Sequence, residues 1–121
     1  MGTKTPHQVV FELIAMIPNG YVASYAQIAR FAGLSNPRQV GQLLKKEGFD
    51  GEIPWHRVVR ADGMIAERPG QAPAVQYRRL LAEGVAISNA GRVDMASHQW
   101  AGPDPDWRLA HGSDPEDVFT A

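Results

Sequence analysis

Apolar residues near the start of the chain recur at the three- and four-residue spacing of an amphipathic helix. Val9, Val10, Leu13, Ile14 and Ile17 make up this set, and their spacing predicts one buried face. Thr5-Pro6 is a favoured helix start, because a threonine oxygen can cap the helix and proline suits the first helical position. Pro18-Asn19-Gly20 has turn chemistry. The pattern therefore predicts a first helix over about 5–17.

Two shorter helices are predicted next. Ser24-Tyr25-Ala26-Gln27 has the form of a capping box, and Gly33 suits the residue that ends this helix. Asn36-Pro37 then starts a helix with polar residues on one face and apolar residues on the other. The outward set is Arg38, Gln39, Gln42, Lys45 and Lys46, and the inward set is Val40, Leu43 and Leu44. Residues 24–47 are a candidate helix-turn-helix, although an ordinary helical hairpin has the same pattern.

The pattern changes at Ile53. Residues 55–59 are expected to be extended, 61–63 to turn, and 64–66 to pair back. A helix is predicted over 72–83, closed by Gly84, with Val75, Leu80 and Leu81 in the core. A short strand, a turn at 89–91 and irregular structure are expected up to Trp100.

Composition favours a single globular domain. The chain has 121 residues, 44% of them hydrophobic, and no cysteine. This excludes disulfides and thiolate metal sites, and the four isolated histidines lack zinc-site spacing, so no metal or cofactor is expected. No apolar stretch has transmembrane length or signal-peptide form. A cytoplasmic protein is expected, associated with the nucleoid when bound to DNA.

Charge is divided unevenly along the chain, whose formal net charge is −1. Residues 101–121 carry five acidic side chains and one arginine, which leaves the first 100 residues with a net charge of +3. A mildly basic body is compatible with DNA binding without demonstrating it. Proline and clustered acids predict a flexible tail over 101–121, beyond a domain over 1–100.

Several ordered motifs resemble the O6-alkylguanine-DNA alkyltransferase family over about residues 7–100. They are Ser24-Tyr25, Arg38-Gln39-Val40-Gly41, Ile53-Pro54-Trp55-His56-Arg57-Val58-Val59, Gly63, and Leu80-Leu81-Ala82-Glu83-Gly84. The family carries its nucleophilic cysteine in a Pro-Cys-His-Arg-Val run, where this chain has Trp55. Tryptophan at that position is the hallmark of the alkyltransferase-like proteins. An indole has only an N–H donor and cannot replace a thiolate nucleophile, so no enzyme activity is expected.

The resemblance implies a mostly α fold with a small β element, a winged-helix-like helix-turn-helix DNA-binding domain of the alkyltransferase C-terminal type. Arg38 matches the arginine finger that fills the gap left by an extruded base, and Tyr25 matches the tyrosine that helps rotate the nucleotide. Gln39 and Gly41 complete the expected DNA contacts, with Gly41 allowing close backbone approach. From position alone, Arg38 could equally contact a phosphate or solvent, and Tyr25 could be a half-buried packing residue.

A lesion pocket is also implied, formed by Tyr25, Trp55, Val58 and Arg68. Trp55 would offer apolar area to the alkyl group or base, unless it is simply a core tryptophan. Arg68 aligns with a loop arginine that faces the flipped base in alkyltransferase-like proteins. His56 and Glu83 correspond to the proton relay of the transferases, here without a cysteine to deprotonate, and are expected to persist as a structural pair. Arg57 is expected to tie the motif to nearby carbonyls or acids.

The expected function is thus non-enzymatic recognition of O6-alkylguanine by base flipping, which marks the lesion for nucleotide excision repair. The expected partners are double-stranded DNA carrying O6-alkylguanine and nucleotide excision repair proteins, with the protein a monomer. Two alternatives remain from the sequence. One is a sequence-specific helix-turn-helix regulator, and the other is a base-processing hydrolase that uses His56 and Glu83 to activate water.

Overall fold

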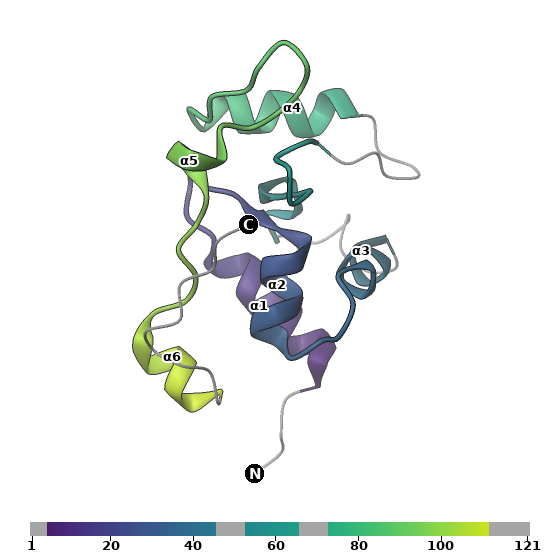
Figure 1. Ribbon diagram of the computed structural model, residues 1–121, viewed down its shortest axis with the longest axis vertical. Coiled ribbons are helices and arrows are strands. Elements are labelled where there is room, and N and C mark those ends of the chain that lie inside the picture. The colour runs from purple at the N-terminus through teal and green to yellow at the C-terminus, as the bar shows by residue number, and fades with distance from the viewer. Residues whose placement is uncertain (1–4, 46–52, 66–72, 112–121) are drawn as a thin grey trace.

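Helices dominate the computed structural model, which describes residues 5–45, 53–65 and 73–111 (Figure 1). In chain order the elements are α1 (Pro6–Met16), β1 (Ala23–Ser24), α2 (Tyr25–Ala32), α3 (Arg38–Leu43), the 3-10 turn η2 (Trp55–Arg57), β2 (Val58–Val59), α4 (Pro73–Ala82), α5 (Met95–His98) and α6 (Pro105–Ala110). The predicted fold class, mostly helical with a small β element, is confirmed.

Helix α1 forms as the sequence predicts. The Thr5 hydroxyl accepts a hydrogen bond from the Gln8 amide at 3.2 Å, and the Gln8 side chain accepts one from the Thr5 amide at 2.9 Å. Such a reciprocal cap satisfies two amides that would otherwise lack partners. The predicted apolar face is buried throughout, and it packs against α2 in the main core.

The two helices of the predicted helix-turn-helix are also confirmed. Ser24 caps α2 by accepting from the Gln27 amide at 3.0 Å, and α2 ends at Gly33, whose φ of 75° favours glycine. Helix α3 begins at Arg38, one residue later than expected, with the Asn36 side chain accepting from the Arg38 amide at 3.0 Å. The inward residues of α3 are buried.

One detail of the predicted capping box is wrong. The Gln27 side chain is fully buried and donates to the Trp100 carbonyl at 2.6 Å instead of returning to Ser24. The start of α2 is therefore connected to the segment near residue 100, a contact that no local pattern could reveal.

A short central strand holds distant segments together. Ala23 and Ser24 of β1 pair in parallel with Val58 and Val59 of β2. On the preceding residue, the Val22 amide donates to the His98 carbonyl at 2.8 Å, and the Val22 carbonyl accepts from Trp100 at 2.7 Å. Residues 22–24 thus lie between the Trp55 segment and the C-terminal part of the fold.

Two local expectations after Ile53 are corrected, and a third is confirmed with an added contact. Residues 55–57 form a turn of 3-10 helix, and only Val58 and Val59 are extended. Met64 does pair back across the 61–63 turn, since its carbonyl accepts from the Arg60 amide at 3.0 Å, and it also bridges Arg92. Leu81 is 44% exposed and outside the core, because the buried side of α4 is formed by Gln76 and Leu80.

The flexible tail expected from residue 101 is wrong for residues 101–111. Asp104 caps α6 by accepting from the Trp107 amide at 2.8 Å, and the Trp107 indole donates to Glu12 of α1 at 2.8 Å. Arg108 is buried over the Phe31 ring and donates to the carbonyls of Pro103 and Ala101. Aromatic packing and these bonds outweigh the acidic composition and place α6 beside α1 and α2.

Candidate nucleic-acid interface

The parallel strand pair brings the helix-turn-helix and the Trp55 segment together. Ser24 ends β1 and caps α2, so Tyr25 lies directly beyond the strand. Val58 begins β2 immediately after the Trp55–Arg57 turn. Pairing of Ala23 with Val58 therefore holds the start of α2 near that turn.

Helix α3 presents an open polar face. Arg38 and Gln39 are exposed, and Val40 on the opposite side is fully buried. A Cβ placed on Gly41 would lie 3.8 Å from Cε1 of Tyr25, which shows that the middle of α3 faces the Tyr25 ring. Tyr25 itself is partly buried and packs against the main core. The predicted DNA contacts thus share one region of the fold, although their contact with DNA stays a prediction.

Trp55 is 2% exposed and belongs to the main core. Its ring meets the His56 ring edge-on with centroids 6.2 Å apart, and the Arg79 guanidinium carbon lies 5.3 Å over it. Val58 is fully buried in the same core. Both side chains pack as core residues here, and their role as walls of a lesion pocket stays a prediction. Arg68 lies outside the described residues.

Glu83 holds the two residues that follow Trp55. Its Oε2 lies 2.7 Å from His56 Nε2 and accepts from Arg57 Nη2 at 2.8 Å, and its Oε1 accepts from Arg57 Nε at 2.9 Å. Arg57 Nη1 also donates to the Ile17 carbonyl at 2.7 Å. The expected His56–Glu83 pair and the tying role of Arg57 are both confirmed. A two-point arginine–carboxylate bond fixes orientation as well as distance.

Burial and charge set the protonation of this network. Burial lowers the pKa of His56 below its ordinary value, outweighing the Glu83 carboxylate, which acts to raise it. Burial acts to raise the pKa of Glu83, but hydrogen bonds from Arg57 and His56 outweigh it and leave that pKa below its ordinary value. At neutral pH His56 is therefore neutral and Glu83 ionised. Because a carboxylate only accepts, the His56 proton lies on Nε2.

Gln76 and Arg79 are site residues that the sequence analysis missed. Gln76 is 1% exposed and donates to the carbonyls of His56 and Val58 at 3.0 and 2.9 Å. In the described part of the chain, His56 Nδ1 and Gln76 Oε1 are buried without hydrogen-bond partners. A helical pattern marks Gln76 as facing the same side as Leu80, and this was the available signal.

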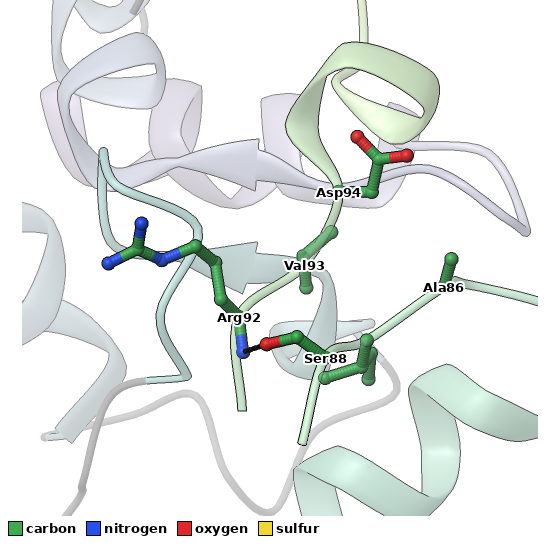
Figure 2. Close-up of a pocket in the computed structure, with 6 residues that line it drawn as sticks. Ala86, Ser88, Arg92, Val93 and Asp94 are labelled. Carbon is green, nitrogen blue, oxygen red and sulfur yellow. Dashed lines mark hydrogen bonds between the residues drawn. The ribbon is translucent and has the colours of Figure 1, made fainter. Parts of the chain in front are cut away.

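Other surface features carry less chemistry. A hollow in the 86–94 hairpin is lined by Ala86, Ile87, Ser88, Arg92, Val93 and Asp94 and contains none of the predicted site residues. Figure 2 shows the Arg92 guanidinium pointing away from Ser88, whose hydroxyl accepts from the Arg92 amide at 3.2 Å. Among the described residues, no group of acids and histidines could hold a metal ion. No described helix is long and apolar enough to cross a membrane.

The sequence of this chain matches a known protein family. Residues 5–85 match the family model of the 6-O-methylguanine DNA methyltransferase DNA-binding domain. The chain belongs to this DNA-binding family. The match includes α1, the helix-turn-helix, the Trp55 segment and the Glu83 end of α4. All the predicted site residues therefore lie within the matched region.

Similar members of the family include proteins with names other than methyltransferase. An Escherichia coli DNA base-flipping protein is 41% identical over 96 residues, which cover 77% of this chain and 72% of that protein. Alkyltransferase-like protein 1 of Schizosaccharomyces pombe is 34% identical over 97 residues, covering 75% of this chain and 90% of that one. A mouse methylated-DNA–protein-cysteine methyltransferase is 38% identical over 81 residues, covering 64% and 37% respectively.

Solved structures within the family show the same fold. The crystal structure of S. pombe Atl1 in complex with damaged DNA containing O6-carboxymethylguanine matches with a TM-score of 0.69 at 33% identity. The match covers 83% of this chain and 98% of Atl1. A second structure of the S. pombe protein with DNA matches with a TM-score of 0.67. The predicted helix-turn-helix fold of the alkyltransferase type is thereby confirmed.

Proposed function

We propose that this chain is a non-enzymatic DNA-damage recognition protein that binds O6-alkylguanine by base flipping. Its likeness to proteins named for base flipping, and to a protein solved on O6-carboxymethylguanine DNA, supports this function. The methyltransferases in the same family are named for a protein cysteine, and this chain has none. Recognition without transfer accounts for both facts.

The network around Glu83 carries the proposal. His56 and Arg57 are both held by Glu83 beside a buried Trp55, in a chain without cysteine. A histidine relay that serves catalysis needs a nucleophile to deprotonate. Here we infer that Trp55 takes the place of the cysteine, and that the His56–Glu83 pair orients the segment on which Trp55 lies.

The open side of the helix-turn-helix supplies the inferred DNA contacts. Arg38, at the first turn of α3, is exposed and has the planar guanidinium needed to stack in the gap left by an extruded base. Tyr25 and Gly41 lie beside each other, where the DNA backbone would have to pass. Gln39 adds a polar contact next to Arg38. In this family, insertion from such a helix would enter the minor groove and bend the duplex.

The consequences for the cell are part of the same proposal. A lesion that is bound and never repaired has to be passed to another system, and we infer that the complex marks it for nucleotide excision repair. The protein would act in the cytoplasm, on the nucleoid, as a monomer. Co-purification of excision repair proteins on an immobilised lesion duplex, but not on its undamaged counterpart, tests the marking step.

Binding to matched duplexes tests lesion recognition directly. The protein is titrated against duplexes with guanine or O6-methylguanine at one position, across a salt series. We expect tighter binding to the lesion at every salt concentration, with affinity falling as salt rises, because phosphate contacts release counterions. Equal binding to both duplexes would contradict the proposal. A strong consensus selected from random undamaged DNA would instead support a transcription regulator.

A Trp55→Cys variant tests the non-enzymatic assignment. We expect little or no transfer of a labelled methyl group to the protein. A thiol introduced at position 55 would still need a water-mediated path to His56 to lose its proton, and His56 is buried. Nucleosides from a lesion duplex incubated with the wild type are analysed in parallel. Any lost alkyl group or released base in that arm would favour a hydrolase over a recognition protein.

A further inference from the structure

Arg79 lies on α4 with its guanidinium carbon 5.3 Å above the Trp55 ring. The residue is exposed, whereas the ring beneath it is buried. In the part of the chain that the structure describes, this guanidinium has no carboxylate partner. The charge of Arg79 also acts on the neighbouring His56, where it opposes protonation. Arg79 is therefore an exposed cation that lies over the Trp55 ring.

The other charges of this site cancel. Arg57 is neutralised by its two-point bond to Glu83. His56 is neutral because burial lowers its pKa. The group formed by Trp55, His56, Arg57, Arg79 and Glu83 thus carries one net positive charge, and it is that of Arg79.

The contact with Trp55 uses none of the hydrogen-bond donors of Arg79, and within residues 5–45, 53–65 and 73–111 no hydrogen bond from these donors is seen. A guanidinium carries five N–H donors in a planar fork suited to phosphate and carboxylate oxygens. A cation–π contact employs the charge over the ring and consumes none of these donors. The ring also restricts a long, flexible side chain, which lowers the entropy that a ligand must remove. Its available donors and its restricted side chain therefore favour the binding of an anion by Arg79.

We propose that Arg79 is an anion-binding residue of the lesion site, which receives the anionic oxygens that arrive with an extruded nucleotide. This inference rests on the proposed function. Two sources can present such oxygens: the phosphate beside the extruded nucleotide, or a carboxylate on the alkyl group itself. In the first case Arg79 contributes to every flipped complex. In the second it selects among lesions in favour of acidic alkyl groups.

Three variants separate charge from packing. Arg79→Gln removes the charge and keeps a polar side chain, and Arg79→Lys keeps the charge but loses the planar fork. Arg78→Gln makes the same charge change one residue away on α4, so it controls for net charge. Thermal melting of each variant verifies folding before binding is measured.

Each variant is titrated against three duplexes that carry guanine, O6-methylguanine or O6-carboxymethylguanine, across a salt series. If the phosphate is the source, Arg79→Gln binds both lesions about tenfold more weakly, in line with loss of one charged hydrogen bond. The slope of log affinity against log salt also falls by about 0.9. If the carboxylate is the source, the loss is confined to the carboxymethyl duplex. Arg79→Lys retains most of the salt slope, and Arg78→Gln changes lesion binding less than Arg79→Gln.

A folded Arg79→Gln that binds all three duplexes with wild-type affinity and salt slope overturns this inference and shows that Arg79 only packs on Trp55. Equal losses in Arg79→Gln and Arg78→Gln overturn it as well, because they indicate a general charge effect. The proposed function is judged separately by the wild type, which must prefer the lesion duplexes to guanine.

Discussion

The helix-turn-helix and the Trp55 site use their residues in opposite ways. Along α3, the side chains expected to meet DNA come from one short stretch and are exposed. Around Trp55, the partners come from separate elements: Arg57 reaches Glu83 and Ile17, and Gln76 reaches His56 and Val58. The first region exposes its side chains to a partner. In the second region, most polar groups form hydrogen bonds with other residues of the same chain.

Because of this difference, substitutions in the two regions should affect different properties, DNA binding in one and folding stability in the other. An exposed side chain without internal bonds can be removed with little effect on stability. A partly buried charge cannot, because its partner is then left uncompensated. We therefore expect removal of the exposed Arg38 side chain on α3 to alter DNA binding with little change in stability, and substitutions around Glu83 to alter stability first.

The largest effect on stability is expected for Glu83→Ala. Removing this carboxylate leaves the Arg57 charge without its partner in a largely buried position, which should lower the free energy of unfolding by about 3 kcal/mol. Urea denaturation followed by circular dichroism measures the change. Glu83→Gln, which keeps one acceptor oxygen, should lose less. An unchanged denaturation midpoint for Glu83→Ala would contradict the view that the residues around Glu83 stabilise the fold.

The largest effect on recognition is expected for Arg38→Ala. Arg38 is exposed on α3, and its removal should abolish most discrimination between O6-methylguanine and guanine duplexes. The free energy of unfolding should change by less than about 0.5 kcal/mol. Gln42→Ala, on an exposed position of the same helix, is the matched control. Retained discrimination in a folded Arg38→Ala would rule out the arginine-finger role.

Lowering the pH should reduce the folding stability contributed by the Trp55 site in two steps. The pKa of His56 is lowered in the folded protein, so the unfolded chain binds a proton more readily and stability falls as the pH drops below about 6.5. The pKa of Glu83 is also lowered, so its contribution is present above about 4.3 and is lost as the pH falls through the folded value. Urea denaturation from pH 7 down to about pH 3 measures both steps, because the second begins only below the ordinary pKa of glutamate.

Matched histidine variants assign the first of these steps. His56→Gln should flatten the dependence between pH 7 and pH 5.5, whereas His7→Gln, at an exposed position on α1, should leave it unchanged. If both variants behave alike, the first step does not belong to His56.

The smallest effect is expected for Gly41→Ala. The added methyl group would lie 3.8 Å from the Tyr25 ring, an ordinary contact, and alanine favours a helix over glycine by about 1 kcal/mol. Stability should therefore rise slightly, and DNA affinity should fall if close backbone approach is needed at this position. Melting and duplex titration of one sample measure both. A rise in stability with unchanged affinity would remove Gly41 from the interface.

Local patterns predicted the parts of the fold that depend on near neighbours. Thr5 and Ser24 mark helix starts because their caps bond residues three positions ahead. The same approach failed at residues 55–57, which were expected to be extended and instead form a 3-10 turn. It also failed for α6, because acidic composition conceals the packing of Trp107 and Arg108.

By itself, the sequence determined the first helix, the helix-turn-helix and the absence of a thiol, since periodicity, capping and composition act locally or need no geometry. The motif resemblance also indicated His56 and Glu83 as a pair. Only the tertiary structure decided that Arg57 joins that pair, that Gln76 supports it, and that Arg79 lies over Trp55. Each of these contacts joins residues about 20 or more positions apart, so it depends on how the strands and α4 pack. Burial, which fixes the charge of His56, likewise arises only when those elements meet.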